Sequence, residues 1–378
     1  MSIRPLEPIT RWLRANFETC DGSRMTSMEG LRGLAVLLVF AHHYATQALL
    51  LHPSGLTAQV AEAAKRYGNL GVELFFVLSG YLIYGLLVSK KTGFLRFMSR
   101  RVVRIYPAFV VAFAFAFAME VPSLADAGVA DVAGTIVANL LLLPGILPGE
   151  PILRVAWSLS YEFFFYFATA LLVAVAGLRR CGASARMTVL LTLTAVFCLL
   201  SLAETPHIPV RMLPFFAGML LFETQRVSAR AVHSSAALAA PAVAFAVGEM
   251  MPLLPLVREL IHTTAFFLLC AACFAGTGMA AKALSWAPLR WLGNMSYSYY
   301  LMHGFAVTAG ARALGAAVST DGSQVWFWVV APLLFVASLV PSALLYLFVE
   351  KPISLQSVRR VQSSSVAVET GVSLAKAA

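Results

Sequence analysis

The chain has 378 residues, of which 60% are hydrophobic and 12% are charged, and its formal net charge is +10. Soluble domains carry about twice that share of charged residues, and the same composition excludes a disordered chain, a collagen helix and a disulfide scaffold. Apolar runs of about 20 residues recur along the whole length and predict an all-α, polytopic membrane helix bundle, in which the positive charge belongs to basic cytoplasmic loops and not to a nucleic-acid surface.

The apolar runs predict the membrane helices in chain order. The candidates are Leu31–Leu51, Leu70–Ser89, Ile105–Val121, Val129–Pro148, Trp157–Gly177, Met187–Ala203, Pro209–Phe222, Ala231–Met251, His262–Ala281, Ser296–Ala317 and Val325–Phe348.

Basic residues decide which of these runs cross the membrane. Four arginines place the N-terminus at the cytoplasm, and the basic loop 89–104 then lies on the same side. A full span at Val129–Pro148 would put Arg179, Arg180 and Arg186 outside. Because its C-terminal part is rich in Pro and Gly, we expect 129–148 to be a re-entrant or outer-face segment. The prediction is about ten transmembrane helices with both termini cytoplasmic.

Two tails are expected to flank the membrane domain. Residues 1–24 are basic and lack an apolar core, so they are expected to form a cytoplasmic N-terminal tail without a cleavable signal peptide. Residues 353–378 have no periodicity and are expected to be a loose, disordered cytoplasmic tail. The membrane domain then spans residues 25–352, with no soluble domain appended.

The redox-like spacing of Cys270 and Cys273 inside an apolar run is interpreted as helix packing, and no metal site is predicted.

The first span carries ionisable residues on one face. His43 follows Arg32 by eleven residues, so the two lie within about 20° of each other around a helix axis and roughly 16 Å apart along it. Glu29 falls on the same side. Intramembrane charges are costly and therefore candidates for function. The alternative for His43 is a buried histidine satisfied by a neighbouring hydroxyl. His42 lies about 80° away around the axis and is interpreted as a structural or supporting residue.

A basic pair stands at the start of the third span. Arg101 and Arg104 share a helix face at the expected cytoplasmic mouth. On charge alone they anchor the helix at the membrane surface. The alternative is a phosphate clamp, because paired guanidinium groups match phosphate oxygens.

The outer ends of two spans carry acidic and aromatic residues. Ser158 and Glu162 lie one helical turn apart just after Trp157, and Glu162 precedes three phenylalanines. A carboxylate there needs a partner, which is either a structural bond or a binding site. Glu73 lies near the outer boundary of the second span and is either interfacial or part of the same site.

A second intramembrane histidine follows a run of hydroxyl residues. Ser296, Tyr299 and His303 fall on one side of the ninth span, which places His303 near mid-depth. Both a satisfied core histidine and a ligand-contacting one fit this pattern.

These segments follow one another in a specific order. They are Glu29-Gly-Leu-Arg32-Gly with ten residues between Arg32 and His43, Gly71…Phe75-Phe76-Val-Leu-Ser79-Gly80, Arg101-Val-Val-Arg104-Ile-Tyr-Pro107, Trp157-Ser158-Leu-Ser160-Tyr-Glu162, Ser296-Tyr297…Tyr300-Leu-Met-His303 and Val349-Glu350-Lys351-Pro352. Together they resemble the acyltransferase family 3 membrane proteins, which are bacterial integral-membrane O-acyltransferases such as exopolysaccharide and O-antigen acetylases. The resemblance covers about residues 25–352.

The resemblance implies transfer of an acyl group, usually acetyl, from cytoplasmic acyl-coenzyme A to a carbohydrate hydroxyl beyond the bacterial inner membrane. Acyl-coenzyme A would be a co-substrate, with no tightly bound cofactor. The family's essential arginine–histidine pair falls on Arg32 and His43, and its two-arginine motif on Arg101 and Arg104. The chain departs from the family in carrying Glu73 where aspartate is usual, and in lacking the appended esterase-like domain of some relatives.

The chemistry of the residues agrees with this expectation. A histidine can accept the proton of a sugar hydroxyl, so His43 is expected to act as base or to carry the acyl group, with Glu29 or Glu162 orienting its ring. Arg32, Arg101 and Arg104 would bind the phosphates of the donor. The acceptor, an exopolysaccharide, O-antigen or lipid-linked oligosaccharide, would contact the remaining candidates Glu73, Trp157, Ser158, Tyr299 and His303.

Two other functions compete with this prediction. A transporter or flippase of lipid-linked glycans would line a pathway with His and Arg, but would need no acyl-coenzyme A and gives no reason for the register of Arg32 and His43. A membrane glycan polymerase or ligase usually needs a large outer loop, whereas the longest outer segment here, about 122–156, has few charges.

Overall fold

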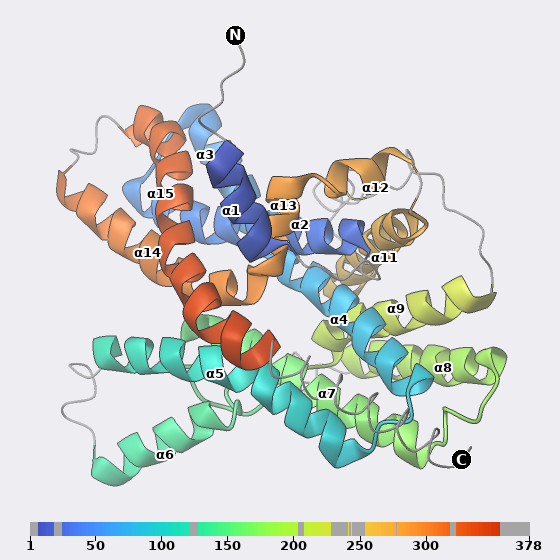
Figure 1. Cartoon of the computed structure of the whole chain (residues 1–378). Coiled ribbons are helices and arrows are strands. Elements are labelled where there is room, and N and C mark those ends of the chain that lie inside the picture. Colours follow the sequence, from blue (N-terminus) through green and yellow to red (C-terminus); the bar gives the residue numbers. More distant parts are fainter. Residues whose placement is uncertain are drawn as a thin grey trace.

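The structure is a computed structural model that describes residues 7–18, 25–120, 128–202, 208–227, 241, 243, 254–276, 278–317 and 323–355. Within these ranges the chain is built of helices without strands (Figure 1). The helices are α1 (Glu7–Phe17), α2 (Thr26–Ala48), η2 (Leu49–Leu51), α3 (Gly55–Gly68), α4 (Leu70–Ser89), α5 (Phe94–Glu120), α6 (Val129–Leu140), η4 (Arg154–Ala156), α7 (Trp157–Val175), α8 (Ala183–Leu202), α9 (Ile208–Val227), α11 (Pro255–Phe274), α12 (Met279–Leu284), α13 (Ala287–Asn294), α14 (Ser296–Ala317), α15 (Ser323–Leu345) and η6 (Tyr346–Leu355).

The predicted all-α, polytopic membrane fold is confirmed. Seven helical segments in the described part of the chain are long and apolar enough to cross a membrane. The helices α9 and α14 have the length but are more polar, and the expected span Ala231–Met251 lies outside the described residues apart from Pro241 and Val243. The number of ten spans therefore stays a prediction.

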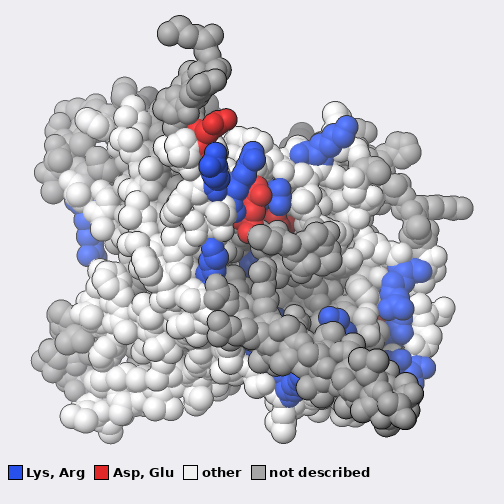
Figure 2. All heavy atoms as spheres, in the orientation of Figure 1, with Lys and Arg blue, Asp and Glu red and all other residues white. Residues whose placement is uncertain are grey.

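The outer helices present apolar side chains outward, as a bundle in lipid requires. Figure 2 shows a face that is largely uncharged, with Lys and Arg in a few small groups. Large exposed apolar residues on α7, α8 and α15 include Phe167, Leu171, Val175, Leu191, Leu199, Leu333 and Val336.

The segment at 129–148 is not a full span. Its helix α6 has 12 residues and is therefore about 18 Å long. The hydrocarbon core of a bilayer is about 30 Å thick. The chain then turns, and Pro144 and Leu147 form an isolated bridge. This agrees with the expected re-entrant or outer-face segment.

The N-terminal segment differs from the expected tail. Residues Glu7–Phe17 form helix α1, which docks on the membrane domain. Asn294 donates to the carbonyl of Phe17 at 2.8 Å, Lys351 donates to that of Asn16 at 2.9 Å, and the Phe17 ring stacks on Tyr346. Hydropathy did not reveal α1 because a short docked helix needs only one apolar side. At the other end η6 extends the domain to Leu355, and the expected tail beyond it lies outside the described residues.

Glycines let α4 and α9 approach closely. A Cβ added at Gly80 would lie 2.1 Å from the carbonyl oxygen of Phe215, and one at Gly218 would lie 2.0 Å from that of Val77. Gly80 and Gly218 thus act as small residues that allow close helix packing in a membrane bundle. A buried ion pair joins α9 to α8, because Arg186 donates to Glu223 at 2.6 and 2.8 Å. Arg186, expected in a cytoplasmic loop, is therefore inside the bundle.

We predict that Gly80→Ala lowers the free energy of unfolding by about 1–3 kcal/mol, the usual cost of overpacking. The added methyl group has no space because its neighbour is backbone. Gly134→Ala on α6 is the matched control, since nothing lies within 4 Å of its added Cβ. The stability of both variants is measured as the midpoint of thermal unfolding in detergent. A wild-type midpoint for Gly80→Ala would contradict the close approach.

Candidate active site

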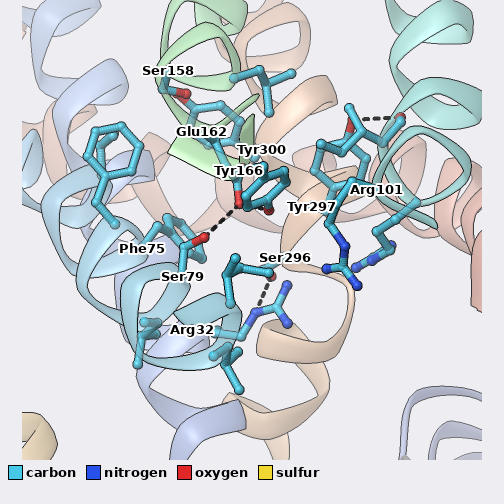
Figure 3. A pocket seen from close by; sticks show the side chains of 18 residues that line it. Arg32, Phe75, Ser79, Arg101, Ser158, Glu162, Tyr166, Ser296, Tyr297 and Tyr300 are labelled. Atoms are coloured by element: carbon cyan, nitrogen blue, oxygen red, sulfur yellow. Dashed lines mark hydrogen bonds between the residues drawn. The ribbon is translucent and has the colours of Figure 1, made fainter. Parts of the chain in front are cut away.

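One pocket of about 180 Å³ lies where α2, α4, α5, α7 and α14 meet. Figure 3 shows arginines from two different helices pointing toward it, with Glu162 and several hydroxyl groups on the facing walls. Five predicted site residues line it, namely Arg32, Arg101, Arg104, Ser158 and Glu162. The pocket thus unites distant parts of the sequence. Among these five residues, Arg32 of α2 and Glu162 of α7 lie 130 positions apart.

Glu162 is held by two hydroxyl groups. Ser79 of α4 donates to Oε1 of Glu162 at 3.2 Å, and Tyr166, one turn further along α7, donates to the same oxygen. The two donors compensate the carboxylate for leaving water. They also show how an acidic residue is accommodated in front of three phenylalanines.

The two arginines of α5 that line the pocket, Arg101 and Arg104, have different surroundings. The guanidinium of Arg101 lies over the rings of Phe97 and Tyr166, at 5.5 and 5.8 Å from their centroids. Its Nε atom is buried and has no hydrogen-bond partner within the part of the chain that the structure describes. Arg101 therefore keeps hydrogen-bonding capacity for an anionic ligand.

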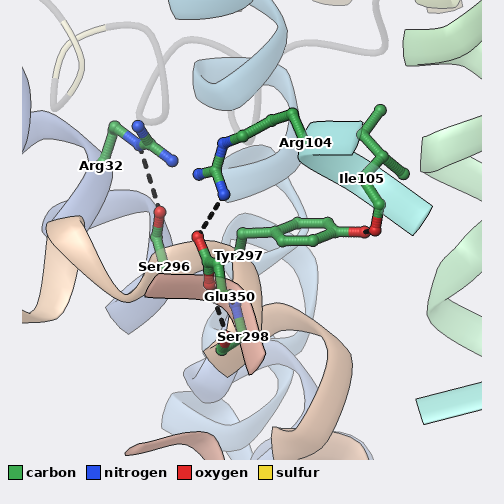
Figure 4. Close-up of polar contacts among 7 residues, drawn as sticks. All are labelled: Arg32, Arg104, Ile105, Ser296, Tyr297, Ser298 and Glu350. Atoms are coloured by element: carbon green, nitrogen blue, oxygen red, sulfur yellow. Dashed lines mark hydrogen bonds and ion pairs between the residues drawn. The ribbon is translucent and has the colours of Figure 1, made fainter. Parts of the chain in front are cut away.

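Arg104 is engaged by a buried acid. Its Nη1 atom lies 2.5 Å from Oε1 of Glu350 in η6, whose side chain is 0% exposed (Figure 4). The other oxygen of Glu350 accepts the Ser298 backbone N–H at 3.1 Å and the Ser298 hydroxyl at 2.5 Å. Glu350 therefore caps the first turn of α14 while it neutralises Arg104.

Arg32, Tyr297 and Tyr300 also line the pocket. The Nε of Arg32 donates to the Ser296 hydroxyl at 3.1 Å. Tyr297 donates to the carbonyl of Ile105 at 2.8 Å and its ring lies under Arg104. The hydroxyl groups of Ser158 and Tyr300 lie 2.7 Å apart.

His43 lies outside the pocket lining, beside a second histidine. Its ring centroid is 4.8 Å from that of His303. The His303 ring in turn lies 5.9 Å from Tyr300, which does line the pocket. The His42 ring lies 5.0 Å from that of His43, and its Nδ1 is 2.5 Å from the carbonyl oxygen of Lys65, which fits a structural or supporting role.

Glu29 and Tyr299 do not take the places expected of them. Glu29 is paired with Arg290 of α13 at 2.9 Å, and it lies about 21 Å from His43 along the continuous helix α2. It cannot orient the His43 ring, because a shared face does not bring residues fourteen positions apart together. The hydroxyl of Tyr299 lies 2.9 Å from that of Ser338, and its side chain is fully buried.

Glu73 and Trp157 belong to a separate polar cluster. Arg211 of α9 lies over the Trp157 ring at 4.3 Å. Glu73 interacts electrostatically with Glu259 of α11 and with Arg211. One carboxylate oxygen each of Glu73 and Glu259 is buried without a hydrogen-bond partner among the described residues.

Several of these residues were missed from the sequence. Glu350 carried the clearest signal, since it is an acid directly after an apolar run. Glu259 and Arg211 had the same kind of signal at the ends of their runs. Ser296 and Tyr300 stood in a motif but were given no role, and Tyr166 carried no signal, because hydroxyl residues are common in membrane helices.

Known proteins are similar to most of the chain. Residues 25–347 match the family described as an acyltransferase domain. Acyltransferase MdmB of Streptomyces mycarofaciens is 29% identical over 361 residues, which cover 87% of this chain and 91% of MdmB. Exopolysaccharide production protein ExoZ of Rhizobium meliloti is 28% identical over 269 residues, which cover 69% of this chain and 83% of ExoZ.

YrhL of Bacillus subtilis, provisionally named a peptidoglycan O-acetyltransferase, is 28% identical over 375 residues. The match covers 88% of this chain but 55% of YrhL, so the chain spans about half the length of that relative. No solved structure matches the chain significantly.

Proposed function

The chain belongs to the acyltransferase domain family, whose match spans residues 25–347, and from this premise we propose that it moves an acyl group from cytoplasmic acyl-coenzyme A to a hydroxyl of an extracytoplasmic or lipid-linked carbohydrate. The acyl group is most simply acetyl, and the protein acts in the bacterial inner membrane with both termini cytoplasmic. The observation that carries the proposal is the pocket in which Arg32, Arg101 and Arg104 gather with Glu162.

The donor would enter at the end of the bundle that carries Arg101 and Arg104. The basic residues of 89–104 support a cytoplasmic position for that end under the positive-inside rule. The pocket has a volume of about 180 Å³. This suits an acyl thioester and its neighbouring chain, while the phosphates of coenzyme A stay at the arginine-lined mouth.

The acceptor would approach the opposite ends of α4, α7, α9 and α11. Glu73, Trp157, Arg211 and Glu259 gather there, and carboxylates with unused oxygens can accept sugar hydroxyls. The names of ExoZ and YrhL refer to an exopolysaccharide and to peptidoglycan, which supports a glycan as the acceptor class.

The reaction balances without a further reactant. The acceptor hydroxyl loses its proton to a ring nitrogen of His43, and the oxygen attacks the thioester carbonyl carbon. The carbon–sulfur bond breaks, and the leaving thiolate takes the proton back from His43. The products are the O-acyl carbohydrate and coenzyme A. Glu162, with its two hydroxyl donors, would bind polar groups of the substrates in the pocket.

Labelled acetyl-coenzyme A tests the proposal. We expect membranes that contain the protein to transfer label to carbohydrate, and the surface glycan of the producing strain to exceed that of a deletion strain by the mass of an acyl group. Membranes without the protein are the control. A glycan of unchanged mass that disappears from the surface of the deletion strain would instead indicate a transporter or flippase.

A further inference from the structure

The protein fixes the tautomer of His303. This residue of α14 is 0% exposed, and its Nδ1 lies 3.0 Å from the carbonyl oxygen of Tyr299 and 2.9 Å from that of Tyr300. Carbonyl oxygens only accept hydrogen bonds, so Nδ1 must carry the hydrogen. In the neutral ring Nε2 then has a lone pair and can only accept.

The accepting atom of His303 is unused. Its Nε2 is buried and has no hydrogen-bond partner in the ranges that the structure describes. A buried polar atom without a partner is unusual and calls for an explanation. The neighbouring ring of His43 lies 4.8 Å away between centroids and is inclined at 63°.

His43 is partly exposed, whereas its neighbour His303 is fully buried. The ring of the third histidine, His42, also lies near His43, at 5.0 Å between centroids, but His42 is partly exposed and its Nδ1 is bonded to the Lys65 carbonyl, whereas Nε2 of His303 is buried without a partner among the described residues. Neither carboxylate expected to orient His43 is suited to do so, because Glu29 is paired with Arg290 and Glu162 is bonded to Ser79 and Tyr166.

We propose that His303 is a positioning residue for His43, a role that rests on the proposed acyl transfer. One ring nitrogen of His43 donates its hydrogen to Nε2 of His303. This bond fixes the His43 tautomer and leaves the other nitrogen without hydrogen, ready to take the proton of the acceptor hydroxyl. When His43 becomes charged by that proton, the same bond stabilises the imidazolium until the proton passes to the leaving thiolate. The Nδ1 bonds of His303 to its own helix hold the pair in place.

Two substitutions separate positioning from support of the fold. The amide nitrogen of His303→Asn can keep the bond to the helix carbonyls, but this side chain is too short to reach His43. His303→Gln is longer and can present an oxygen near the position of Nε2. We expect kcat of His303→Asn to fall by at least about tenfold. The decrease should not exceed the 10²–10⁴-fold that a positioned base contributes, and KM of both substrates should stay unchanged. His303→Gln should recover most of kcat.

Three results would overturn the role. An increase in KM for the acceptor at constant kcat would make His303 a substrate-contacting residue. Equal losses of kcat in both variants would indicate support of the fold alone. A wild-type kcat in His303→Asn would show that no positioning is needed.

Nitrogen NMR of histidine-labelled wild-type protein gives a test that needs neither activity nor a variant. We expect His303 to carry hydrogen on Nδ1 and to accept a hydrogen bond at Nε2; hydrogen on Nε2 would overturn the inference. If the wild-type protein transferred no acyl group, the proposed function would fail while the NMR result still decided whether the pair exists.

Discussion

Replacing His43 by alanine is expected to lower kcat of acyl transfer by about 10²–10⁴-fold, the contribution typical of a positioned general base. The acceptor hydroxyl is a poor nucleophile at neutral pH and loses its proton acceptor in this variant. KM for the acyl donor should change little, because His43 lies outside the lining of the arginine pocket. Initial rates with labelled acetyl-coenzyme A in membranes of matched protein content provide the measurement.

The neighbouring histidine is the matched control for this prediction. His42→Gln should keep a rate near that of the wild type, because the Gln amide can still bond to the Lys65 carbonyl and His42, whose ring is 5.0 Å from His43, has no part in the proposed proton transfer. A normal rate for His43→Ala would refute the assignment. The mass of the intact protein after incubation with the donor alone distinguishes a base from an acyl-carrying residue, since only the latter gains an acyl group.

The helices were predictable because bilayer thickness and composition determine them. The expected span Leu70–Ser89 is helix α4 with the same bounds, since apolar residues along its whole length satisfy a helix in lipid. Helices α1 and α3 were missed because neither is apolar enough to stand out from its surroundings. Hydropathy detects what contacts lipid, and these helices pack beside the bundle.

The partners of the ionisable residues were not predictable in the same way. Arg32 and His43 share a face of α2, as the helical periodicity indicated, but only Arg32 lines the pocket. Glu29 pairs with Arg290 and Arg104 with Glu350, and both partners are far away in the sequence. Such pairs depend on which helices become neighbours, and the packing of apolar helices in lipid leaves little trace in hydropathy.

The separation of Arg32 from His43 has a mechanistic consequence. Along α2 they are roughly 16 Å apart. In the proposed reaction, a donor whose phosphates stay at the arginines must therefore span about this distance with its thioester arm to reach His43. This favours a long, flexible acyl carrier such as coenzyme A over a compact donor.

Arg104→Met is expected to reduce the free energy of unfolding by about 3–5 kcal/mol, the usual result of removing one partner from a buried ion pair. Its partner Glu350 is 0% exposed and would keep an uncompensated charge in the bundle. Adding Glu350→Gln should restore most of the stability, because the amide is neutral and its oxygen can still accept the Ser298 N–H of the first turn of α14. Thermal unfolding in detergent of the two single variants and the double variant completes the cycle.

Kinetic measurements on variants of Arg101 and Arg104 distinguish the roles of these two arginines of α5. Arg101→Met should raise KM for acetyl-coenzyme A by roughly 10- to 100-fold, since hydrogen bonds to charged groups contribute about 1.5–3 kcal/mol. The double variant Arg104→Met with Glu350→Gln should keep a donor KM near that of the wild type, because Glu350 already neutralises the charge of Arg104. An equal increase in KM in both would mean that Arg104 leaves Glu350 to bind the donor phosphates, and that the pair seen here is the resting arrangement of a two-arginine clamp.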